Sequence, residues 1–231
     1  MLTAPQFSSD GLVAVRSRIA AAARRAGRDP AQVRLLAVSK QQPEAAIRLL
    51  AAAGQLTFGE NYVQESLAKI DALRDLPLAW HFIGQLQANK TREVAERFQW
   101  VHTVDRLRIA ERLSGQRPHH APPLEVLIQV KLADEAAKGG VTPAELPALA
   151  SAVAALPRLK LRGLMCIPPD STTEDEQRRP FRRLRELRDG LNAAGHRLDD
   201  LSMGMSNDLE AAILEGATVV RVGTAVFGPR T

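Results

Sequence analysis

Short apolar segments alternate with helical patterns along most of the chain, and this alternation restricts the folds that the chain can adopt. Eight apolar segments are predicted as strands: Arg34–Val38, Leu56–Phe58, Trp80–Ile83, Trp100–Thr103, Leu124–Val130, Leu159–Met165, Asp200–Met203 and Thr218–Val222. A helical pattern follows each of the first seven, beginning near Pro43, Asn61, Ala88, Arg106, Pro143, Glu174 and Asn207. Before the first strand, Val13–Arg25 is an alanine- and arginine-rich helix that Gly27 ends.

Repeated strand–helix units imply parallel strands joined by right-handed crossovers. Eight units within 231 residues predict an α/β fold, a single closed (β/α)8 TIM barrel over residues 33–230, with an extra N-terminal helix over residues 10–27. No linker marks a second domain, so residues 1–231 are predicted to form one domain. An open doubly wound sheet is the alternative, because the second and seventh strands are short. Only a short tail is expected after the eighth strand.

Two of the predicted helices have recognisable N-terminal caps. Thr142 offers a hydroxyl at the N-cap with Pro143 at the first helical position. Ser206-Asn207-Asp208 offers a second cap before a helix over Leu209–Leu214. These caps predict where two of the strand–helix loops end.

The composition favours a folded protein and argues against a binding surface for single-stranded nucleic acid. The chain is 45% hydrophobic and 25% charged, which allows a sizeable core, and its aromatic content of 4% argues against base stacking. Much of the net charge of +5 comes from the arginines of residues 178–188. Interleaved acidic residues predict the solvated face of an amphipathic helix, with a patch that binds nucleic acid or an anionic surface as the alternative.

The single cysteine, Cys166, excludes an internal disulfide and fits a reducing compartment. The first residues do not form the basic and apolar pattern of a signal peptide, and no window approaches the roughly 18 apolar residues of a membrane helix. We therefore expect a cytoplasmic protein that contacts neither membrane nor nucleic acid.

Lys40 is placed where a charged side chain is hard to explain without a function. Leu36 and Val38 share one face of the first strand at a period of two, and Lys40 continues that face. An ammonium in an apolar interior is unfavourable unless it is paired or neutral. Schiff-base lysines are desolvated in this way, and barrels carry their active sites at the carboxyl ends of the strands. A surface lysine just past a strand end is the alternative.

The loops after the seventh and eighth strands predict a phosphate site. In a TIM barrel, loop amides and a helix N-terminus commonly bind phosphate there. Gly204 and Gly223 allow the backbone to approach closely, and Ser206 and Thr224 add hydroxyl donors. Ser206 is also expected at the start of a helix. Glycine near a strand end is otherwise only a turn residue.

Arg221 lies on the inward face of the eighth strand with Val219, if that strand alternates. A buried guanidinium requires an acceptor. A ligand's ring nitrogen or phosphate, Glu60 or Asp105 could supply it. A strand-end lysine, an arginine and a phosphate cradle together predict one of two chemistries. One is a Schiff base with a phosphorylated sugar, as in an aldolase, and the other is a Schiff base with pyridoxal phosphate.

The remaining candidates have simpler interpretations. His81 is predicted as a barrel-interior residue with a satisfied hydrogen bond, and His102 is interpreted in the same way. His119 and His120 have no partner at metal-ligand spacing, so no metal is predicted. Cys166 is predicted as a small apolar filler near the pocket.

Six motifs resemble the pyridoxal phosphate homeostasis protein family, the YggS/PROSC type: Ala37-Val38-Ser39-Lys40, Phe58-Gly59-Glu60-Asn61-Tyr62-Val63-Gln64-Glu65, Trp80-His81-Phe82-Ile83-Gly84, Gly163-Leu164-Met165, Ser202-Met203-Gly204-Met205-Ser206 and Val220-Arg221-Val222-Gly223-Thr224-Ala225-Val226-Phe227-Gly228. The resemblance implies a barrel similar to the N-terminal domain of alanine racemase, in the fold-type III class of pyridoxal 5'-phosphate (PLP) proteins. The implied cofactor-binding residues are Lys40 for the Schiff base, Arg221 for the pyridine nitrogen, Ser206, Gly223 and Thr224 for the phosphate, and Asn61 and Met165 for the ring pocket.

The resemblance also implies a role in intracellular PLP (vitamin B6) homeostasis, in which the protein holds and releases the cofactor without robust catalysis. A pyridine nitrogen facing a guanidinium is not readily protonated, so the ring is a weaker electron sink. Racemases of this class take a second base from a further C-terminal domain, whereas this chain ends at Thr231. A racemase-like PLP enzyme is the alternative. PLP-dependent apo-enzymes are the expected recipients, and a monomer is expected, with a dimer as the alternative.

One position departs from the family pattern. Many members carry a second lysine two positions after the Schiff-base lysine, whereas Gln42 stands there in this chain. A role for a second amine at that position is therefore not predicted here. Lys138 is another loop amine and is predicted as a plain surface residue.

Overall fold

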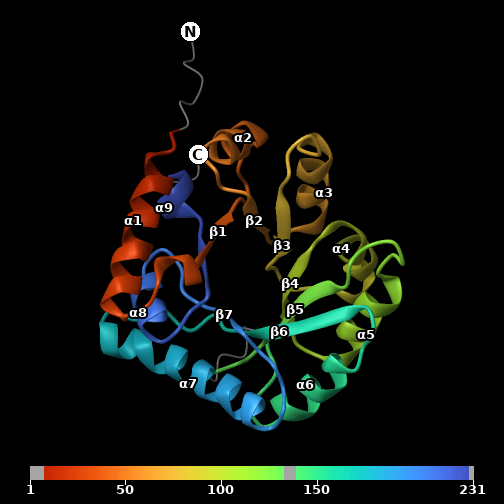
Figure 1. The fold of residues 1–231 in the computed structure, drawn as a ribbon. Coiled ribbons are helices and arrows are strands. Elements are labelled where there is room, and N and C mark those ends of the chain that lie inside the picture. Colours follow the sequence, from red (N-terminus) through yellow and green to blue (C-terminus); the bar gives the residue numbers. More distant parts are fainter. Residues whose placement is uncertain (1–7, 133–138, 229–231) are drawn as a thin grey trace.

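The computed structural model describes residues 8–132 and 139–228. Within these residues, eight parallel strands close into a barrel in chain order, and helices surround it (Figure 1). The strands are β1 (Arg34–Val38), β2 (Thr57–Glu60), β3 (Ala79–Phe82), β4 (Trp100–Val104), β5 (Leu124–Gln129), β6 (Leu159–Met165), β7 (Asp200–Ser202) and β8 (Val219–Val222). The helices are α1 (Asp10–Arg25), α2 (Glu44–Ala52), α3 (Val63–Ala72), α4 (Thr91–Arg97), α5 (Leu107–Gln116), α6 (Leu146–Ala154), α7 (Glu174–Ala193), α8 (Leu209–Leu214) and α9 (Thr224–Phe227), with 3-10 turns at Pro30–Gln32 and Ala88–Lys90.

Pairing between β1 and β8 closes the barrel. Arg34 pairs with Val219 and Ala37 pairs with Val222, so the first and last strands lie side by side. The predicted TIM barrel is therefore confirmed, and the alternative of an open sheet is wrong. Each observed strand overlaps the segment predicted for it, including the three-residue β7.

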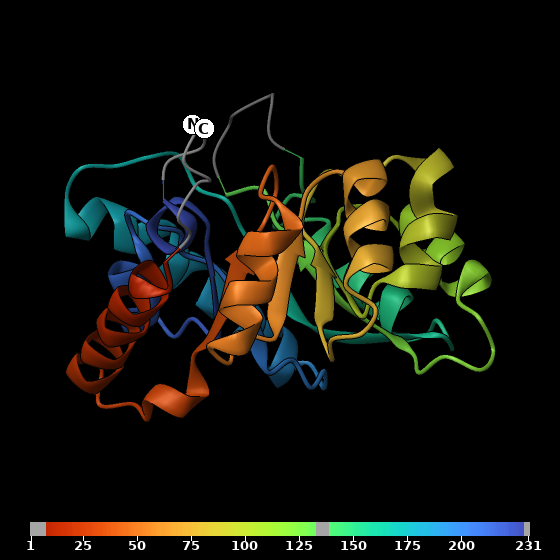
Figure 2. The ribbon, with the colours of Figure 1, turned by 90° about the horizontal axis from the view of Figure 1, so that it is seen from above.

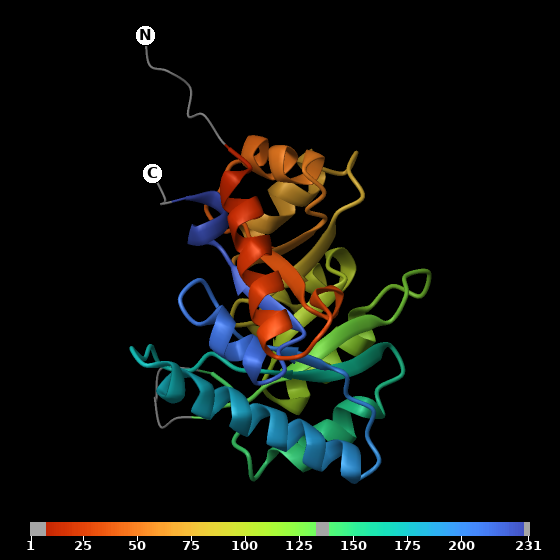
Figure 3. The ribbon, with the colours of Figure 1, turned by 60° about the vertical axis from the view of Figure 1, so that its left-hand side comes forward.

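Helices cover the outside of the barrel, as right-handed crossovers require. Helices α2, α3 and α4 follow one another around one side (Figure 2), and α1 packs across α8 and α9 (Figure 3). The expectation of only a tail after β8 is wrong, because the N–H groups of Val226 and Phe227 donate to the Gly223 carbonyl and form α9. Four residues are too few to show a helical period in the sequence.

The start of α6 also differs from the prediction. The helix begins at Leu146 rather than at Pro143. Thr142 and Glu145 do form a capping box, because the Glu145 N–H donates to the Thr142 hydroxyl at 3.4 Å and the Thr142 N–H donates to the Glu145 carboxylate at 3.3 Å. This hydrogen-bonded turn stands just before the helix instead of inside its first turn.

The main hydrophobic core lies between the barrel and its helices. Phe58 and Phe181 are fully buried members of it. A separate small cluster consists of Leu36, Ile83 and Val219, and Val38 packs against it, which confirms the face predicted for β1. Because this inner cluster is small, the interior of the barrel has room for the polar groups that form the candidate site.

The arginine-rich segment forms α7, the longest helix at 20 residues. Its apolar side buries Phe181 and Leu184, as the amphipathic pattern predicts. Some of its arginines do more than face the solvent, because they form ion pairs with the buried carboxylate of Glu215. These are Arg178, Arg182 and Arg185. In the described ranges, no helix combines the length and apolar composition needed to cross a membrane.

We expect Glu215→Ala to lower the free energy of unfolding by roughly 1–3 kcal/mol, because it removes a buried carboxylate that pairs with arginines of α7. Urea denaturation measures this change. Glu186→Ala is the matched control, since its partner Arg183 and Glu186 itself are both exposed, and its effect should stay within about 0.5 kcal/mol. Equal effects of the two substitutions would contradict the assignment of Glu215 as the anchor of α7.

Candidate functional site

A cavity of about 280 Å³ opens at the carboxyl ends of the strands. Its lining includes most of the predicted site residues, which come from five separate loops or strands: Lys40, Asn61, Ser206, Arg221, Gly223 and Thr224. Val38, Ile83, Ile167 and Met205 supply its apolar walls. The structure therefore brings together six of the seven residues that sequence analysis grouped as one site.

Met165 is the exception. It is the last residue of β6, is fully buried, and is not among the residues that line the cavity. The chain reaches the cavity two residues later, at Ile167, after β6 has ended. Met205, from the loop after β7, is the methionine that lines the cavity.

Lys40 follows β1 in a tight turn. The Ser39 N–H still donates to the Gly59 carbonyl at 3.0 Å, and the Gln42 N–H then donates back to the Ser39 carbonyl at 3.0 Å. Between them Gln41 takes a left-handed φ of 61°, which is unusual for a residue other than glycine. The turn ends the strand, so Lys40 is the last residue of this segment that lines the cavity.

Arg221 is 4% exposed and is held by two hydrogen bonds. It donates to the Ser202 hydroxyl at 2.8 Å and to the Cys166 carbonyl at 2.9 Å. Burial lowers the pKa of the Arg221 guanidinium. The sequence also allowed Glu60 or Asp105 as the acceptor for Arg221, and this prediction is wrong. Glu60 accepts hydrogen bonds from Ser39 and Lys69, and Asp105 forms an ion pair with Arg106.

The polar chain continues from Ser202 through the barrel interior. The Ser202 Oγ lies 2.9 Å from His102 Nδ1, and His102 Nε2 lies 2.9 Å from His81 Nδ1. The His81 ring stacks on Trp100 with centroids 5.2 Å apart. The predicted satisfied hydrogen bond of His81 is confirmed. The histidine pair itself was missed, although the period-two pattern of adjacent strands could have revealed it.

One arrangement of hydrogens satisfies this whole chain. Arg221 donates to Ser202, the Ser202 hydroxyl donates to His102 Nδ1, and His102 Nε2–H donates to His81 Nδ1. Burial lowers the pKa of His81 to about 3, with the charge of Arg34 as a smaller cause. Burial also lowers the pKa of His102 well below its ordinary value, and a protonated His102 would in addition be repelled by a protonated His81 and by Arg221. Both imidazoles are therefore neutral in the folded protein near neutral pH.

The loops after β7 and β8 meet on the other side of the cavity. Gly204 has a φ of 92°, and its carbonyl accepts the Arg221 N–H at 2.9 Å, which ties the loop after β7 to strand β8. Gly223 is the N-cap of α9, and Thr224 is the first residue of that helix. Ser206 is not at the start of α8 as expected, because Asp208 is the N-cap.

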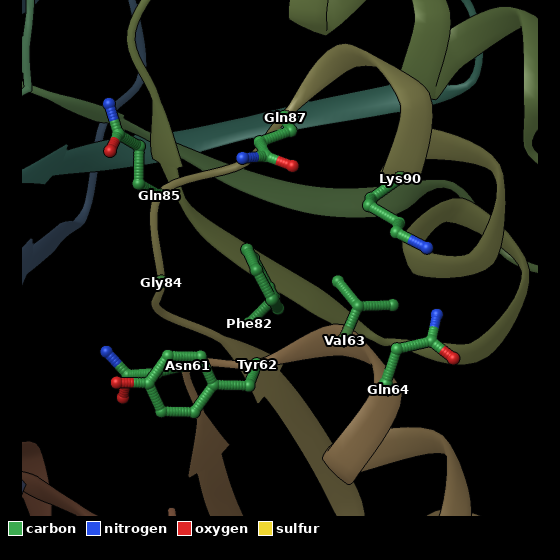
Figure 4. Close-up of a pocket in the computed structure, with 9 residues that line it drawn as sticks. All are labelled: Asn61, Tyr62, Val63, Gln64, Phe82, Gly84, Gln85, Gln87 and Lys90. Atoms are coloured by element: carbon green, nitrogen blue, oxygen red, sulfur yellow. The ribbon is translucent and has the colours of Figure 1, made fainter.

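Asn61 separates this cavity from a second one. A groove of about 430 Å³ lies between the start of α3 and the chain that joins β3 to α4 (Figure 4). Tyr62, Val63 and Gln64 line one side of it, and Phe82, Gly84, Gln85, Gln87 and Lys90 line the other. Asn61 lines both spaces. Its Oδ1 atom is buried and accepts no hydrogen bond from any described residue, so it is placed to accept one from a ligand.

Comparison with known proteins identifies the family. Residues 11–231 match the family described as "Alanine racemase, N-terminal domain". The pyridoxal phosphate homeostasis protein of Pseudomonas aeruginosa is 59% identical over 222 residues, which cover 96% of this chain and 95% of that protein. The chain belongs to the pyridoxal phosphate homeostasis protein family. The Escherichia coli protein of the same name is 53% identical, with 95% of each chain covered.

A solved structure supports the same relationship. PipY of Synechococcus elongatus, determined with PLP bound, is 42% identical and has a TM-score of 0.82, covering 93% of this chain and 100% of PipY. The Pseudomonas aeruginosa and Escherichia coli relatives are named as homeostasis proteins and not as enzymes. The resemblance that the sequence motifs indicated is thus confirmed at the level of family and fold.

Other features of this member of the family have structural explanations. Cys166 is buried, and burial raises the pKa of its thiol to about 12, so it is a filler whose carbonyl serves Arg221. Among the described residues, no group of three His, Cys, Asp or Glu side chains is arranged to hold a metal ion. Lys138 lies outside the described residues.

Proposed function

We propose that this chain binds PLP as a Schiff base on Lys40 and releases it to other proteins in the cytoplasm, as part of vitamin B6 homeostasis. The observation that carries the proposal is the single cavity that unites Lys40 with Arg221 and with the loop of Gly223 and Thr224. PLP supplies an aldehyde, with which the Lys40 amine condenses and loses one water. The PLP-bound structure of PipY supports this choice of ligand.

Each lining residue has a role toward this ligand. Arg221 faces the pyridine nitrogen, and since a guanidinium has no acceptor, that nitrogen stays unprotonated. Ser202 and the Cys166 carbonyl hold the guanidinium in place. Ser206, Gly223 and Thr224 bind the phosphate through hydroxyl and amide donors. Asn61 accepts a hydrogen bond beside the ring, and Ile167 and Met205 take the place that Met165 was expected to fill.

The same residues favour retention over catalysis. A racemase needs bases on both faces of its substrate. Among the described residues that line the cavity, Lys40 carries the one amine, and none carries a carboxylate or an imidazole. An unprotonated ring nitrogen also weakens the electron sink that carbanion chemistry requires. We therefore propose a carrier rather than an amino-acid racemase or a sugar-phosphate aldolase.

The groove lined by Tyr62, Val63 and Gln64 borders the cofactor cavity at Asn61. This groove is the surface that we propose for contact with PLP-dependent apo-enzymes, because it lies next to the cofactor cavity. We propose such apo-enzymes as recipients of the cofactor and a monomer as the active form.

The absorption spectrum of the purified protein with PLP, before and after borohydride, tests the proposal. We expect a Schiff-base band that bleaches on reduction and a reduced adduct that maps to Lys40, with neither in Lys40→Ala. Absence of the adduct from the wild-type protein would refute binding of PLP as a Schiff base. An adduct formed only with a phosphorylated sugar would favour the aldolase. Sustained racemisation that Lys40→Ala abolishes would favour the racemase.

A further inference from the structure

Lys69 is a buried cation that the proposed function does not use. It lies on α3 and is 6% exposed. Its ammonium donates to the Ser39 carbonyl at 2.6 Å, to Glu60 Oε1 at 2.9 Å and to Glu65 Oε1 at 2.5 Å. An ammonium has three hydrogens, so these three acceptors use all of them. Its surroundings therefore fix this side chain in one position.

The acceptors of Lys69 hold the residues on both sides of Lys40 in the chain. Ser39, which precedes Lys40, gives its carbonyl to Lys69 and its hydroxyl to Glu60 Oε1, the latter at 2.6 Å. Gln41, which follows Lys40, donates its N–H to Glu65 Oε1 at 2.5 Å. Lys69 joins the two carboxylates, so one cation holds the backbone before and after Lys40.

The conformation of this turn explains why such a hold is needed. Gln41 has a φ of 61° and is the one non-glycine residue with a positive φ in residues 8–132 and 139–228. Such a conformation is unfavourable for a side chain with a Cβ and persists only when its surroundings determine it. The hydrogen bond from the Gln41 N–H to Glu65 fixes this conformation next to Lys40.

Stability alone does not explain the buried ion cluster of Lys69, Glu60 and Glu65. Glu60 is fully buried, and its Oε2 atom has no hydrogen-bond partner among the described residues. Burial raises the pKa of Glu60, and the charge of Lys69 only partly opposes this. Replacing a buried ion pair by apolar groups is often neutral or stabilising, so such a pair points to a role in specifying one conformation.

We propose that Lys69 is a positioning residue, which fixes the backbone on both sides of Lys40 and thereby orients the Lys40 amine toward PLP. The inference rests on the proposed function, because it assigns Lys69 a role in that same site. Lys69 does not line the cofactor cavity, so it acts through Ser39 and Gln41.

Lys69→Met tests this role, because it keeps the length of the side chain and removes the three donors. We expect PLP retention, measured from the Schiff-base band during PLP titration, to weaken roughly tenfold or more, since small displacements of a reacting group have effects of this size. The rate of band formation should fall with it, while the far-UV circular dichroism stays that of the barrel.

Arg117→Met is the matched control. Arg117 is 6% exposed and donates to the main-chain carbonyls of Ala95, Phe98 and Pro122, remote from the cofactor cavity. It should lower the melting temperature without changing PLP retention. If Lys69→Met retains PLP like the wild type, or if both variants lose it equally, the positioning role is wrong.

A second pair of variants keeps the test decisive if Lys69→Met does not fold. Glu65 is partly exposed, and Glu65→Ala removes the acceptor of the Gln41 N–H while Lys69 keeps Ser39 and Glu60. Glu65→Gln restores an acceptor oxygen and should recover most of the PLP retention. Equal retention in the two variants would overturn the inference. Failure of the proposed function is distinguishable, because the wild-type protein itself would then yield no adduct on Lys40.

Discussion

Replacing Gly84 with alanine is expected to lower the free energy of unfolding by about 3 kcal/mol or more and to weaken PLP retention. A Cβ at this position would lie 2.0 Å from the carbonyl oxygen of Asn61 and 2.7 Å from its carbonyl carbon. Both atoms are backbone, so no side chain can rotate away. Asn61 lines the cofactor cavity, and the displaced backbone would carry the buried Oδ1 atom with it.

Gly115→Ala is the control for this substitution. Gly115 lies in α5, is exposed, and would have no atom within 4 Å of an added Cβ. Alanine should therefore stabilise the protein by up to about 1 kcal/mol, because glycine is unfavourable inside a helix. Urea denaturation and PLP titration of both variants make the comparison. A Gly84→Ala protein that unfolds and binds PLP like the wild type would show that the Asn61 backbone does not hold that position.

The fold could be predicted because its signals are local. Each strand shows its burial in a few consecutive residues, and each helix shows its own period. The count of eight units then favours a closed barrel over an open sheet. Closure itself depends on pairing between residues as distant as Arg34 and Val219, which no local pattern contains. The short helix α9 was not predicted, because four residues are too few to show a helical period.

The candidate site was predictable where a residue's position along its strand decides its environment. Lys40 and Arg221 continue inward faces and line the cavity as expected. The partners of buried charges were not predictable, because they come from other strands. Arg221 was expected to need a carboxylate or a ligand, but a hydroxyl and a main-chain carbonyl satisfy it. The prediction for Met165 was wrong for a related reason. The geometry of the loop after β6 decides which residue reaches the cavity, and the sequence does not show that geometry.

Acidification is expected to destabilise the protein through its buried histidine pair. Folded His81 stays neutral down to its pKa of about 3, whereas the unfolded chain protonates it near the ordinary value of 6.5. Between these values the unfolded state binds more protons, so stability is present above pH 6.5 and is lost as the pH falls. His81 alone should remove about 2 kcal/mol of unfolding free energy between neutrality and pH 5. His102 acts with the same sign, because burial lowers its pKa too.

Urea denaturation between pH 8 and pH 5 measures this effect, and variants assign it. His81→Gln should reduce the slope below pH 6.5 by about 1.4 kcal/mol per pH unit, the limiting contribution of one imidazole. The raised pKa of Glu60 has the opposite sign, since the folded carboxyl takes up its proton at higher pH than the unfolded one, and comparing variants cancels it. His120→Gln is the control, because His120 is exposed and should leave the slope unchanged. A wild-type protein equally stable at pH 8 and pH 5 would mean that the histidine pair does not stay neutral in the folded barrel.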